Sequence, residues 1–550
     1  MTEAKNENDR SGAWGWPPFV PEQFLSYWPV GWKAEPWMAA GADFLKEMTS
    51  IAAGTSALAP DSKDWRFKDK AWSENPLYQR WAQAYLAMCT AVEAMIPDNI
   101  PCKERARAEM VTSIVTSMFA PTNTLVGNPA ALAKTWDTKG DNLAKGFQNF
   151  LRDLGENGGM PAQVDDSGFE VGRNLAVTPG KIVLRTPMFE LIHYAAATDK
   201  VSAVPVLLVP PQIGRYYFTD LAPGRSFAEY TVSQGINYFA ISWRNPSPSE
   251  REWGLDDYLE AAFEAVEAVA EIAGVPKINI VGFCAGGILS AILAAWLEAR
   301  KISLINSLTL CVTMLDFSSD AALGAFRFPA MLSVAKAQSE LKGVLPGDDL
   351  HKVFTLMRPN DLLWNYWVNN YLMGDSPPAF DILAWNKDGT NMPARLHRDF
   401  LELFETNPLI EPGRFKIADE AVDLGRIGCD AFVVGAVTDH LTPWKACYKA
   451  VHLLGGEAMF ALSNGGHIAA LVNPPGNPKA WHKLAPATAP DADGWEAAAV
   501  TMPGSWWESW TKWIADRSGK AVKAPGSPGS AKHKPIADAP GQYVKESPAL

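Results

Sequence analysis

Cys284 lies in the pattern Gly-x-Cys-x-Gly-Gly, formed by residues 282–287. An apolar run typical of a strand precedes the pattern and an apolar helical run follows it, as in a nucleophile elbow. The glycines allow a strained turn to fit between strand and helix without Cβ clashes. Because cysteine stands where serine is usual, the pattern predicts acyl transfer through a thioester. A buried structural cysteine beside a glycine-rich turn is the simpler alternative.

Asp439 and His467 follow later apolar runs, in the chain order in which this kind of site supplies its acid and its histidine. Residues 431–437 are typical of a buried strand, and Thr438-Asp439 comes directly after them. A second short strand over 458–462 is followed by Ser463-Asn-Gly-Gly-His467. We therefore expect Asp439 to be the acid and His467 the base. His440 is adjacent to the acid, which favours a role in shaping the acid loop over a role as base.

The elements that must position these residues are predicted between residues 181 and 515, where short apolar runs alternate with helical stretches. This alternation is typical of a parallel sheet covered by helices on both faces. The spacing of apolar residues over 255–273 predicts a crossover helix. The sequence therefore predicts the α/β class and, within it, the α/β-hydrolase fold. The expected strands are 204–209, 238–243, 278–283, 308–315 and 431–437.

Three segments differ from this alternation. Residues 1–180 are predicted to form a mostly helical N-terminal domain. Residues 316–404 interrupt the catalytic domain, and their many large aromatic residues predict a lid over the active site. An ordinary helical subdomain with an aromatic core is the alternative, and both can hold. Residues 516–550 contain a Pro-Gly-Ser stretch, which predicts a flexible C-terminal tail.

Composition excludes several classes of protein. The net charge of −12 argues against general nucleic-acid binding, which requires a basic surface. The six cysteines form no Cys-x-x-Cys pair and no cysteine–histidine cluster at metal spacing, so we expect no metal site and a reducing compartment. No apolar stretch approaches the roughly 20 residues of a membrane span. The polar start lacks the features of a secretory signal, which favours the cytoplasm.

Many longer segments, distributed from about residue 65 to 545, carry a resemblance to one known family. The chain closely resembles the polyhydroxyalkanoate (poly-3-hydroxybutyrate) synthases, in particular their long, single-polypeptide, class I-like type. It departs from them at Gln212 and Gly214, where a larger or apolar residue and an asparagine are more common, and this leaves the chain-length preference open. The matching segments include Phe67-Lys-Asp-Lys-Ala-Trp, Phe169-Glu-Val-Gly-Arg-Asn-Leu, Ile241-Ser-Trp-Arg-Asn-Pro, the Cys284 elbow, Arg358-Pro-Asn-Asp, Trp385-Asn-Lys-Asp-Gly-Thr, Asp439-His-Leu-Thr-Pro-Trp and Ala539-Pro-Gly-Gln-Tyr-Val.

The resemblance implies polymerisation of (R)-3-hydroxyacyl-coenzyme A into polyhydroxyalkanoate polyester, with release of coenzyme A. Cys284 would carry the acyl chain as a thioester, and His467 would take the thiol proton. Asp439 would either orient His467 or help to deprotonate the 3-hydroxyl of the next monomer. Backbone amides of Ala285 and Ile213 would form the oxyanion hole. No cofactor is implied, because coenzyme A is the leaving group of the substrate.

Three further residues are candidates for binding the substrate. Arg358 and Trp385 lie in segments shared with the family, and His440 adjoins the acid. The alternative for Arg358 is a structural ion pair with a neighbouring acid. Asp316, just after a predicted strand, is an alternative catalytic acid by position, but the longer match around Asp439 outweighs it.

The resemblance further implies a self-sufficient homodimer that associates with polyester granules in the cytoplasm. The aromatic residues near the N-terminus are predicted to contribute to granule attachment or to dimer stability. Packing of this segment onto the catalytic domain as a structural arm is the alternative. The residues concerned are Trp14, Trp16, Trp28, Trp32 and Trp37.

A cysteine-nucleophile hydrolase of the same fold, acting on thioesters or polyester, is the rival function. A polymerase must keep the acyl-enzyme dry until the next alcohol attacks, and a large aromatic lid favours that function. A non-catalytic protein that coats polyester or lipid inclusions would leave the predicted triad without a purpose.

Overall fold

The computed structural model describes residues 34–100, 102–318 and 329–548, which form two compact units. Residues up to 165 and residues 352–380 form the first unit, and the remaining residues form the second. The boundary predicted at residue 180 therefore differs from the observed one. Four of the five N-terminal tryptophans, Trp14, Trp16, Trp28 and Trp32, lie outside the described residues. Trp37 lies in α2 (Ala34–Ala53), with 40% of its surface exposed.

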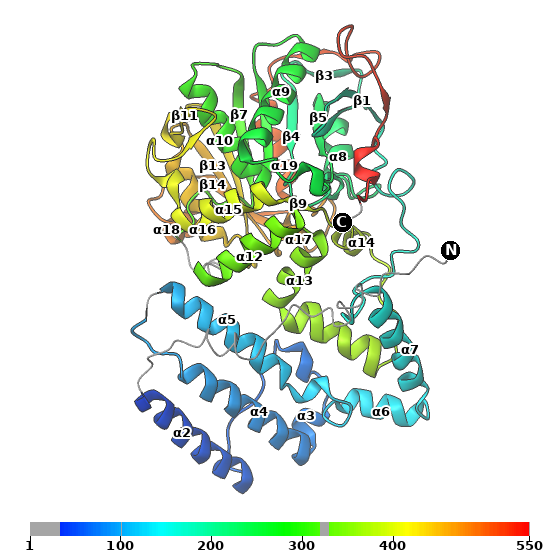
Figure 1. Ribbon diagram of the computed structural model, residues 1–550, viewed down its shortest axis with the longest axis vertical. Helices are drawn as coiled ribbons and strands as arrows, with labels where there is room; N and C mark the ends of the chain where they lie inside the picture. The colour runs from blue at the N-terminus through cyan, green and yellow to red at the C-terminus, as the bar shows by residue number, and fades with distance from the viewer. Residues whose placement is uncertain (1–33, 101, 319–328, 549–550) are drawn as a thin grey trace, which may run out of the picture. The chain divides into compact units, whose positions relative to one another are not determined.

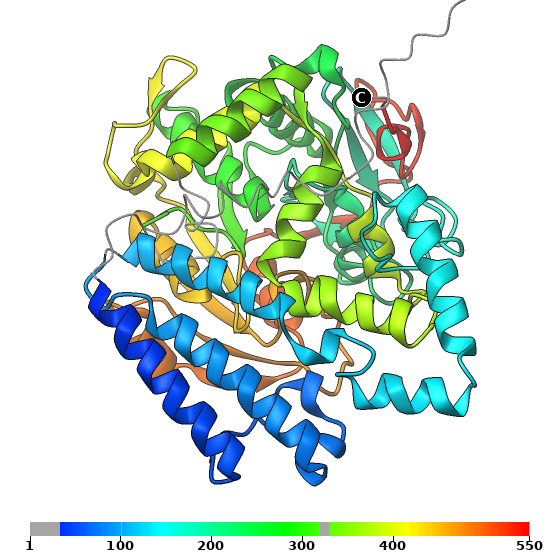
Figure 2. The ribbon, with the colours of Figure 1, turned by 60° about the horizontal axis from the view of Figure 1, so that its bottom comes forward.

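The first unit is helical, as predicted for the N-terminal region. Asn75 precedes α4 (Pro76–Ala94) and Asn128 precedes α6 (Pro129–Asp137). Each side chain accepts a hydrogen bond from a backbone N–H group of the first turn, which has no partner within the helix. A small core gathers around Phe67, Trp72 and Tyr85. Figure 2 shows α2 and α4 lying side by side. The helices are α2 (Ala34–Ala53), α3 (Ala71–Glu74), α4 (Pro76–Ala94), α5 (Cys102–Met118), α6 (Pro129–Asp137), α7 (Asp141–Glu156) and the short Asn360–Trp364 and Trp367–Leu372.

Helix α7 packs against Trp367–Leu372 mainly through polar and small residues, together with an edge-to-face contact between Phe150 and Tyr371. The Asn142 side-chain amide donates to the Leu372 carbonyl at 2.8 Å, and the Tyr371 hydroxyl donates to the Asp153 carboxylate at 2.9 Å. A Cβ atom at Gly146 would overlap the Tyr371 backbone, so the two segments approach closely at that glycine. Residues more than 200 positions apart in the chain are thus joined in one unit.

In the described part of the second unit, one sheet contains eleven strands in the order β15-β14-β13-β12-β7-β6-β4-β5-β2-β1-β17. Its centre, from β13 to β5, is parallel, and its two edges are antiparallel (Figure 1). The strands are β1 (Gly180–Arg185), β2 (Phe189–Tyr194), β4 (Val206–Val209), β5 (Tyr238–Trp243), β6 (Ile278–Phe283), β7 (Ile305–Cys311), β12 (Asp430–Ala436), β13 (Ala458–Ser463), β14 (Trp481–Pro486), β15 (Val500–Pro503) and β17 (Ala537–Asp538).

Two apolar cores cover the two faces of this sheet, because successive side chains of a strand point to opposite faces. In β4, Leu207 and Val209 belong to one core, and Val206 and Leu208 belong to the other. The first face is covered by α9 (Leu255–Ala273), α10 (Ala285–Ala299), α15 (Ala394–Thr406), α16 (Trp444–Lys449) and α18 (Ala492–Ala498) (Figure 1). The second is covered by α8 (Phe227–Ser233), α17 (His467–Leu471) and α19 (Trp506–Ala515).

The predicted central strands and the crossover helix are confirmed, with small differences at their ends. β5, β6 and α9 have the predicted bounds. β7 ends at Cys311 rather than at residue 315, because Val312 has a φ of 46°, which a strand cannot accommodate.

The predicted lid, residues 316–404, is divided between the two units. Residues 352–380 belong to the first unit. The rest of the insertion belongs to the second unit and includes α12 (Pro329–Lys342), β8 (Val344–Leu345), α14 (Asp381–Lys387) and β9 (Met392–Pro393). Helix α13 (Gly347–Met357) runs across the boundary, and β10 (Lys416–Ile417) and β11 (Glu420–Ala421) follow α15.

A membrane-spanning helix needs a long apolar stretch, and no helix within the described ranges has one.

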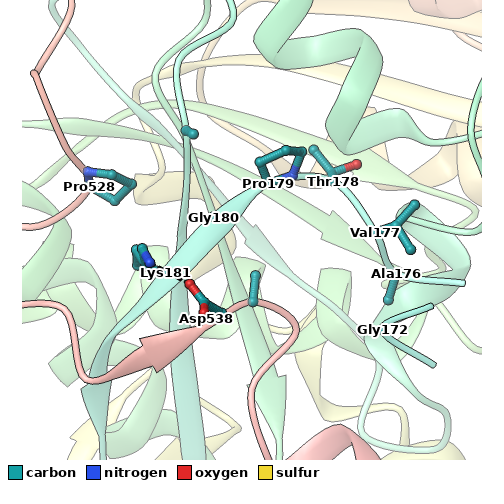
Figure 3. A pocket seen from close by; sticks show the side chains of 11 residues that line it. Gly172, Ala176, Val177, Thr178, Pro179, Gly180, Lys181, Pro528 and Asp538 are labelled. Carbon is teal, nitrogen blue, oxygen red and sulfur yellow. Dashed lines mark hydrogen bonds and ion pairs between the residues drawn. The ribbon is translucent and has the colours of Figure 1, made fainter. Parts of the chain in front are cut away.

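The C-terminal segment, expected to be a flexible tail, lies along the second unit. β16 (Ala521–Lys523) pairs with β3 (Lys200–Ser202), and β17 pairs with β1. Tyr543 is buried, and its hydroxyl donates to the Thr186 carbonyl at 2.7 Å. Backbone pairing and aromatic burial hold a segment whose composition alone predicts flexibility. Figure 3 shows a pocket at this junction, with Lys181 of β1 and Asp538 of β17 paired beside it.

Candidate active site

Cys284 connects β6 to α10 through a strained turn. Its φ of 50° and ψ of −118° lie outside the regions that non-glycine residues ordinarily occupy, which is a common feature of functional sites. The strain is held by backbone hydrogen bonds. The Cys284 N–H donates to the Cys311 carbonyl at 2.9 Å, and the Cys284 carbonyl accepts from the Gly287 N–H at 2.9 Å. The cysteine therefore lies at the carboxyl end of a central parallel strand, where ligands bind in open α/β sheets.

The glycines of the pattern are required by space. A Cβ atom at Gly282 would lie 2.6 Å from both the Gly287 Cα and the Ser290 Oγ. A Cβ atom at Gly287 would overlap the Thr313 side chain. Strand and helix therefore approach as closely as the predicted elbow requires.

Asp439 and His467 come from loops after two neighbouring strands. Asp439 follows β12, and His467 begins α17 after β13. His467 Nδ1 lies 2.7 Å from Asp439 Oδ2, and the two side chains are 8% and 0% exposed. Water is thus excluded from the pair, which strengthens its electrostatic interaction.

The pair shifts both pKa values. Burial alone raises the pKa of Asp439, but His467 and the hydrogen bonds to the carboxylate outweigh burial and lower it. Burial alone lowers the pKa of His467, but its electrostatic interactions and hydrogen bonds with Asp439 and Cys284 raise it to about 10. The surroundings of His467 therefore favour the imidazolium form.

Cys284 completes the group, because it lies close enough to His467 to interact with the imidazole and help raise its pKa. Since Nδ1 of His467 faces Asp439, Nε2 is the nitrogen left for the thiol. The structure thus brings the three residues predicted as the triad into one contiguous group. A thiol next to an imidazole that is oriented by a carboxylate is the arrangement used for nucleophilic acyl transfer.

Thr442 is a member of the site that the sequence reasoning missed. Its hydroxyl donates to Asp439 Oδ2 at 2.7 Å and lies 3.2 Å from His467 Nδ1. The other carboxylate oxygen, Oδ1, accepts from the backbone N–H groups of Leu441 at 2.8 Å and Thr442 at 3.0 Å. Asp439 therefore accepts four hydrogen bonds. The signal in the sequence was an aspartate followed closely by threonine, which is typical of a local turn bonded by the aspartate side chain.

The two residues predicted to form the oxyanion hole lie on different elements. Ala285 is the first residue of α10, so its N–H has no acceptor within the helix and adjoins Cys284. Ile213 is in the loop after β4, half-buried against the core on the α10 face of the sheet.

The substrate-binding candidates fall in both units. Arg358 belongs to the first unit and pairs with Asp361, with Nη2 and Oδ2 2.6 Å apart, which is the ion pair foreseen as its alternative. Trp385 lies in α14 of the second unit, where its Nε1 donates to the Arg215 carbonyl at 2.8 Å. Both Trp385 and Cys284 pack against the core on the α19 face. His440 is half-buried beside Asp439.

Asp316, the alternative acid, forms hydrogen bonds with neighbouring loop residues and with no member of the triad. Its carboxylate accepts from the Ser318 N–H at 2.8 Å and from the Asn407 side-chain amide at 2.9 Å. These bonds tie the segment after β7 to the residue that follows α15.

The pocket of Figure 3 is lined by residues near β1 and by the C-terminal segment, and it includes no member of the triad.

Comparisons with known proteins identify the family and the fold of the chain. Residues 63–231 match the family model described as the N-terminus of poly-beta-hydroxybutyrate polymerase (PhaC), and residues 205–474 match that of the alpha/beta hydrolase fold. The chain is 43% identical to poly(3-hydroxyalkanoate) polymerase 1 of Ectopseudomonas oleovorans, across 92% of this chain and 90% of that protein. It is 37% identical to the poly(3-hydroxyalkanoate) polymerase subunit PhaC of Cupriavidus necator, across 92% and 86% of the two chains. The predicted family and fold are confirmed: the chain belongs to the poly(3-hydroxyalkanoate) polymerases, enzymes with an α/β-hydrolase fold.

Proposed function

We propose that the protein polymerises (R)-3-hydroxyacyl-coenzyme A into polyhydroxyalkanoate, with Cys284 carrying the growing chain as a thioester. The observation that carries this proposal is the contact of the elbow cysteine with a buried His467–Asp439 pair, in a chain of the polymerase family. A thiol suits this role because its exchange with the thioester of coenzyme A is close to thermoneutral. The acyl group can therefore pass on and off the enzyme without a large loss of free energy.

In the first step, the Cys284 thiolate attacks the carbonyl carbon of the substrate thioester. The new carbon–sulfur bond to Cys284 forms, the bond to the coenzyme A sulfur breaks, and the His467 imidazolium returns a proton to the departing thiolate. Backbone N–H groups of Ala285 and Ile213 are the proposed donors to the oxyanion. The products are acyl-Cys284 and free coenzyme A, and no cofactor is needed.

In the second step, the 3-hydroxyl of another monomer attacks the acyl group on Cys284. An ester bond forms, the Cys284 thiolate leaves, and His467 takes the hydroxyl proton. The four hydrogen bonds accepted by Asp439 support an orienting role for this residue, because a buried carboxylate with all its acceptor sites occupied offers none to the substrate hydroxyl. His467 would then act in both steps.

The rival function is hydrolysis, in which water replaces the 3-hydroxyl in the second step. The family membership supports polymerisation over this alternative. The two functions differ in product, because a hydrolase releases one free 3-hydroxy acid for each coenzyme A, whereas a polymerase retains the acyl groups as polyester.

The test is to supply 3-hydroxybutyryl-coenzyme A and measure free coenzyme A, free acid and polymer together. We expect polymer to account for the released coenzyme A, and free acid in equal amount would establish the hydrolase. Cys284→Ala should abolish coenzyme A release, while Cys429→Ala, which changes a half-buried free cysteine, should retain it. Turnover by Cys284→Ala would exclude the thioester at this position.

We further propose that the enzyme is a homodimer at polyester granules in the cytoplasm and favours short monomers of about three to five carbons. Light scattering with and without substrate tests the dimer, and a fully active monomer would contradict it. Analysis of the polymer composition tests the monomer length. A variant that starts near Asp61 should keep thioester turnover but lose dimerisation or granule association.

A further inference from the structure

The loop that follows β4 contains a buried polar side chain with no hydrogen-bonding role in the fold. Gln212 is 3% exposed. Among the described residues, no group hydrogen-bonds to its side-chain nitrogen or its side-chain oxygen. Exchanging the two atoms does not help, because both lack a partner. Buried polar side chains are nearly always bonded, so an unbonded carboxamide calls for an explanation.

The loop lies against the nucleophile elbow. A Cβ atom at Gly286 would overlap the Val209 carbonyl and would lie 2.6 Å from the Pro210 carbonyl carbon. The start of the loop therefore touches the first turn of α10, two residues after Cys284. Gln212 is only two positions beyond Pro210, a span of at most about 7 Å along the chain.

The other side of the loop faces Trp385. A Cβ atom at Gly214 would lie 3.2 Å from the Trp385 ring, and that ring packs against the same core as Cys284. The backbone carbonyl of Gln212 accepts from the Thr390 hydroxyl at 3.4 Å. Gln212 is thus held between two segments of the site, and its neighbour Ile213 is the proposed oxyanion donor. The backbone is fixed while the carboxamide remains unbonded.

We propose that the Gln212 carboxamide binds the 3-hydroxyl group of the acyl chain and so makes the site specific for 3-hydroxyacyl substrates. This inference rests on the proposed function. The thioester oxygen has its proposed donors in the backbone, whereas the 3-hydroxyl, two carbons away, can both donate and accept a hydrogen bond. A carboxamide supplies both an acceptor and a donor. A site that bonds a substrate hydroxyl discriminates against an analogue that lacks it, because the buried polar group then stays unpaired.

The test compares single-turnover acylation of Cys284 by two substrates, (R)-3-hydroxybutyryl-coenzyme A and butyryl-coenzyme A, measured by protein mass. Gln212→Leu and the length-matched Gln212→Met should acylate roughly 10- to 100-fold more slowly with the hydroxylated substrate. Acylation by butyryl-coenzyme A should stay within about twofold of the wild-type rate, since that substrate makes no bond to the carboxamide.

The melting temperature is a second measurement, and it distinguishes a role of Gln212 in substrate binding from a role in stabilising the fold. Both Gln212 variants should melt no lower than the wild type, because an unbonded amide contributes nothing to the fold. Gln83 is the matched control, a buried glutamine whose Nε2 donates to the carbonyls of Ser56 at 3.2 Å and Leu58 at 3.1 Å. Gln83→Leu should melt lower and leave the substrate ratio unchanged.

Two outcomes would overturn the proposal. Equal losses with both substrates would assign Gln212 to the thioester group or to the fold, and an unchanged ratio would leave it no role in recognising the hydroxyl. These outcomes differ from failure of the proposed function, in which wild-type Cys284 would gain no acyl mass from either substrate.

Discussion

Replacing Asp439 with asparagine tests the whole hydrogen-bonding scheme of the triad. The substitution keeps shape and volume, but only one end of the amide can be an acceptor. The Oδ1 position receives two backbone N–H groups, at 2.8 and 3.0 Å, so the amide oxygen must occupy it. The amide nitrogen then takes the Oδ2 position and donates toward His467 Nδ1. The imidazole must carry its proton on Nε2, the nitrogen that should accept the proton of Cys284.

The expected loss is large because the base is held in the wrong tautomer. This kind of change lowers kcat by about ten-thousand-fold in a comparable triad, which corresponds to about 5.5 kcal/mol of activation free energy. The variant also loses the carboxylate charge that raises the pKa of His467. We expect the acylation of Cys284, measured by protein mass after rapid quenching, to fall by this order. The melting temperature serves as the check on folding.

The same experiment separates the two roles considered for Asp439. If Asp439 orients His467, acylation and elongation should fall together. If it acts only on the 3-hydroxyl of the incoming monomer, acylation should continue at the wild-type rate and elongation alone should stop. Asp316→Asn is the matched control, because Asp316 also accepts several hydrogen bonds, but outside the triad. Acylation by Asp439→Asn within tenfold of the wild-type rate would refute the tautomer argument.

Four further predictions concern the nucleophile, its base, the titration of the triad and the C-terminal segment. Cys284→Ser should release coenzyme A far more slowly than the wild type, because an alkoxide is much harder to form than a thiolate; a rate within tenfold would contradict this. In the same assay, His467→Ala should lower the rate of coenzyme A release about as much as Cys284→Ala does, and the double variant should lower it no further. The pKa of His467 is raised from 6.5 to about 10 in the folded protein. Its stabilising contribution is therefore fully present below pH 6.5 and is lost as the pH rises toward about 10. Urea unfolding of the wild type and His467→Gln should converge over that range, and a constant difference would oppose the assignment. Tyr543→Ala should lower the free energy of unfolding by about 3 kcal/mol in urea, because a buried aromatic ring and a hydrogen bond are lost; a change under 1 kcal/mol would mean that the segment contributes little.

The sequence predicts the centre of the catalytic unit well because local patterns specify it. The apolar runs of β5 and β6 are buried along their whole length, and α9 repeats its apolar residues at helical spacing. Cys284, Asp439 and His467 were found because each follows such a strand. Their order along the chain, nucleophile, acid and then histidine, is the order found in the α/β-hydrolase fold.

What the sequence could not predict depends on contacts between distant segments. The strands near the two edges of the sheet, β1, β2, β14 and β15, pair antiparallel, so they fall outside the parallel strand pattern on which the prediction rests. The tail is ordered by pairing with β1 and β3, which its own composition does not encode. The burial of Gln212 without a partner likewise becomes visible only when the residues packed around it are known.

The joining of α7 to Trp367–Leu372 has a consequence for synthesis on the ribosome. Asn142 and its partner Leu372 are 230 residues apart. At a translation rate of about 5–20 residues per second, α7 therefore waits roughly 10–50 s for the segment that packs against it. An apolar face exposed for that time would invite aggregation. The waiting face includes Phe150, which later packs against Tyr371, but it also contains Asn142, Gly146 and Asp153, which water can solvate until the partner emerges. The largely polar character of this contact therefore suits a unit whose two parts, residues up to 165 and residues 352–380, are translated far apart in time.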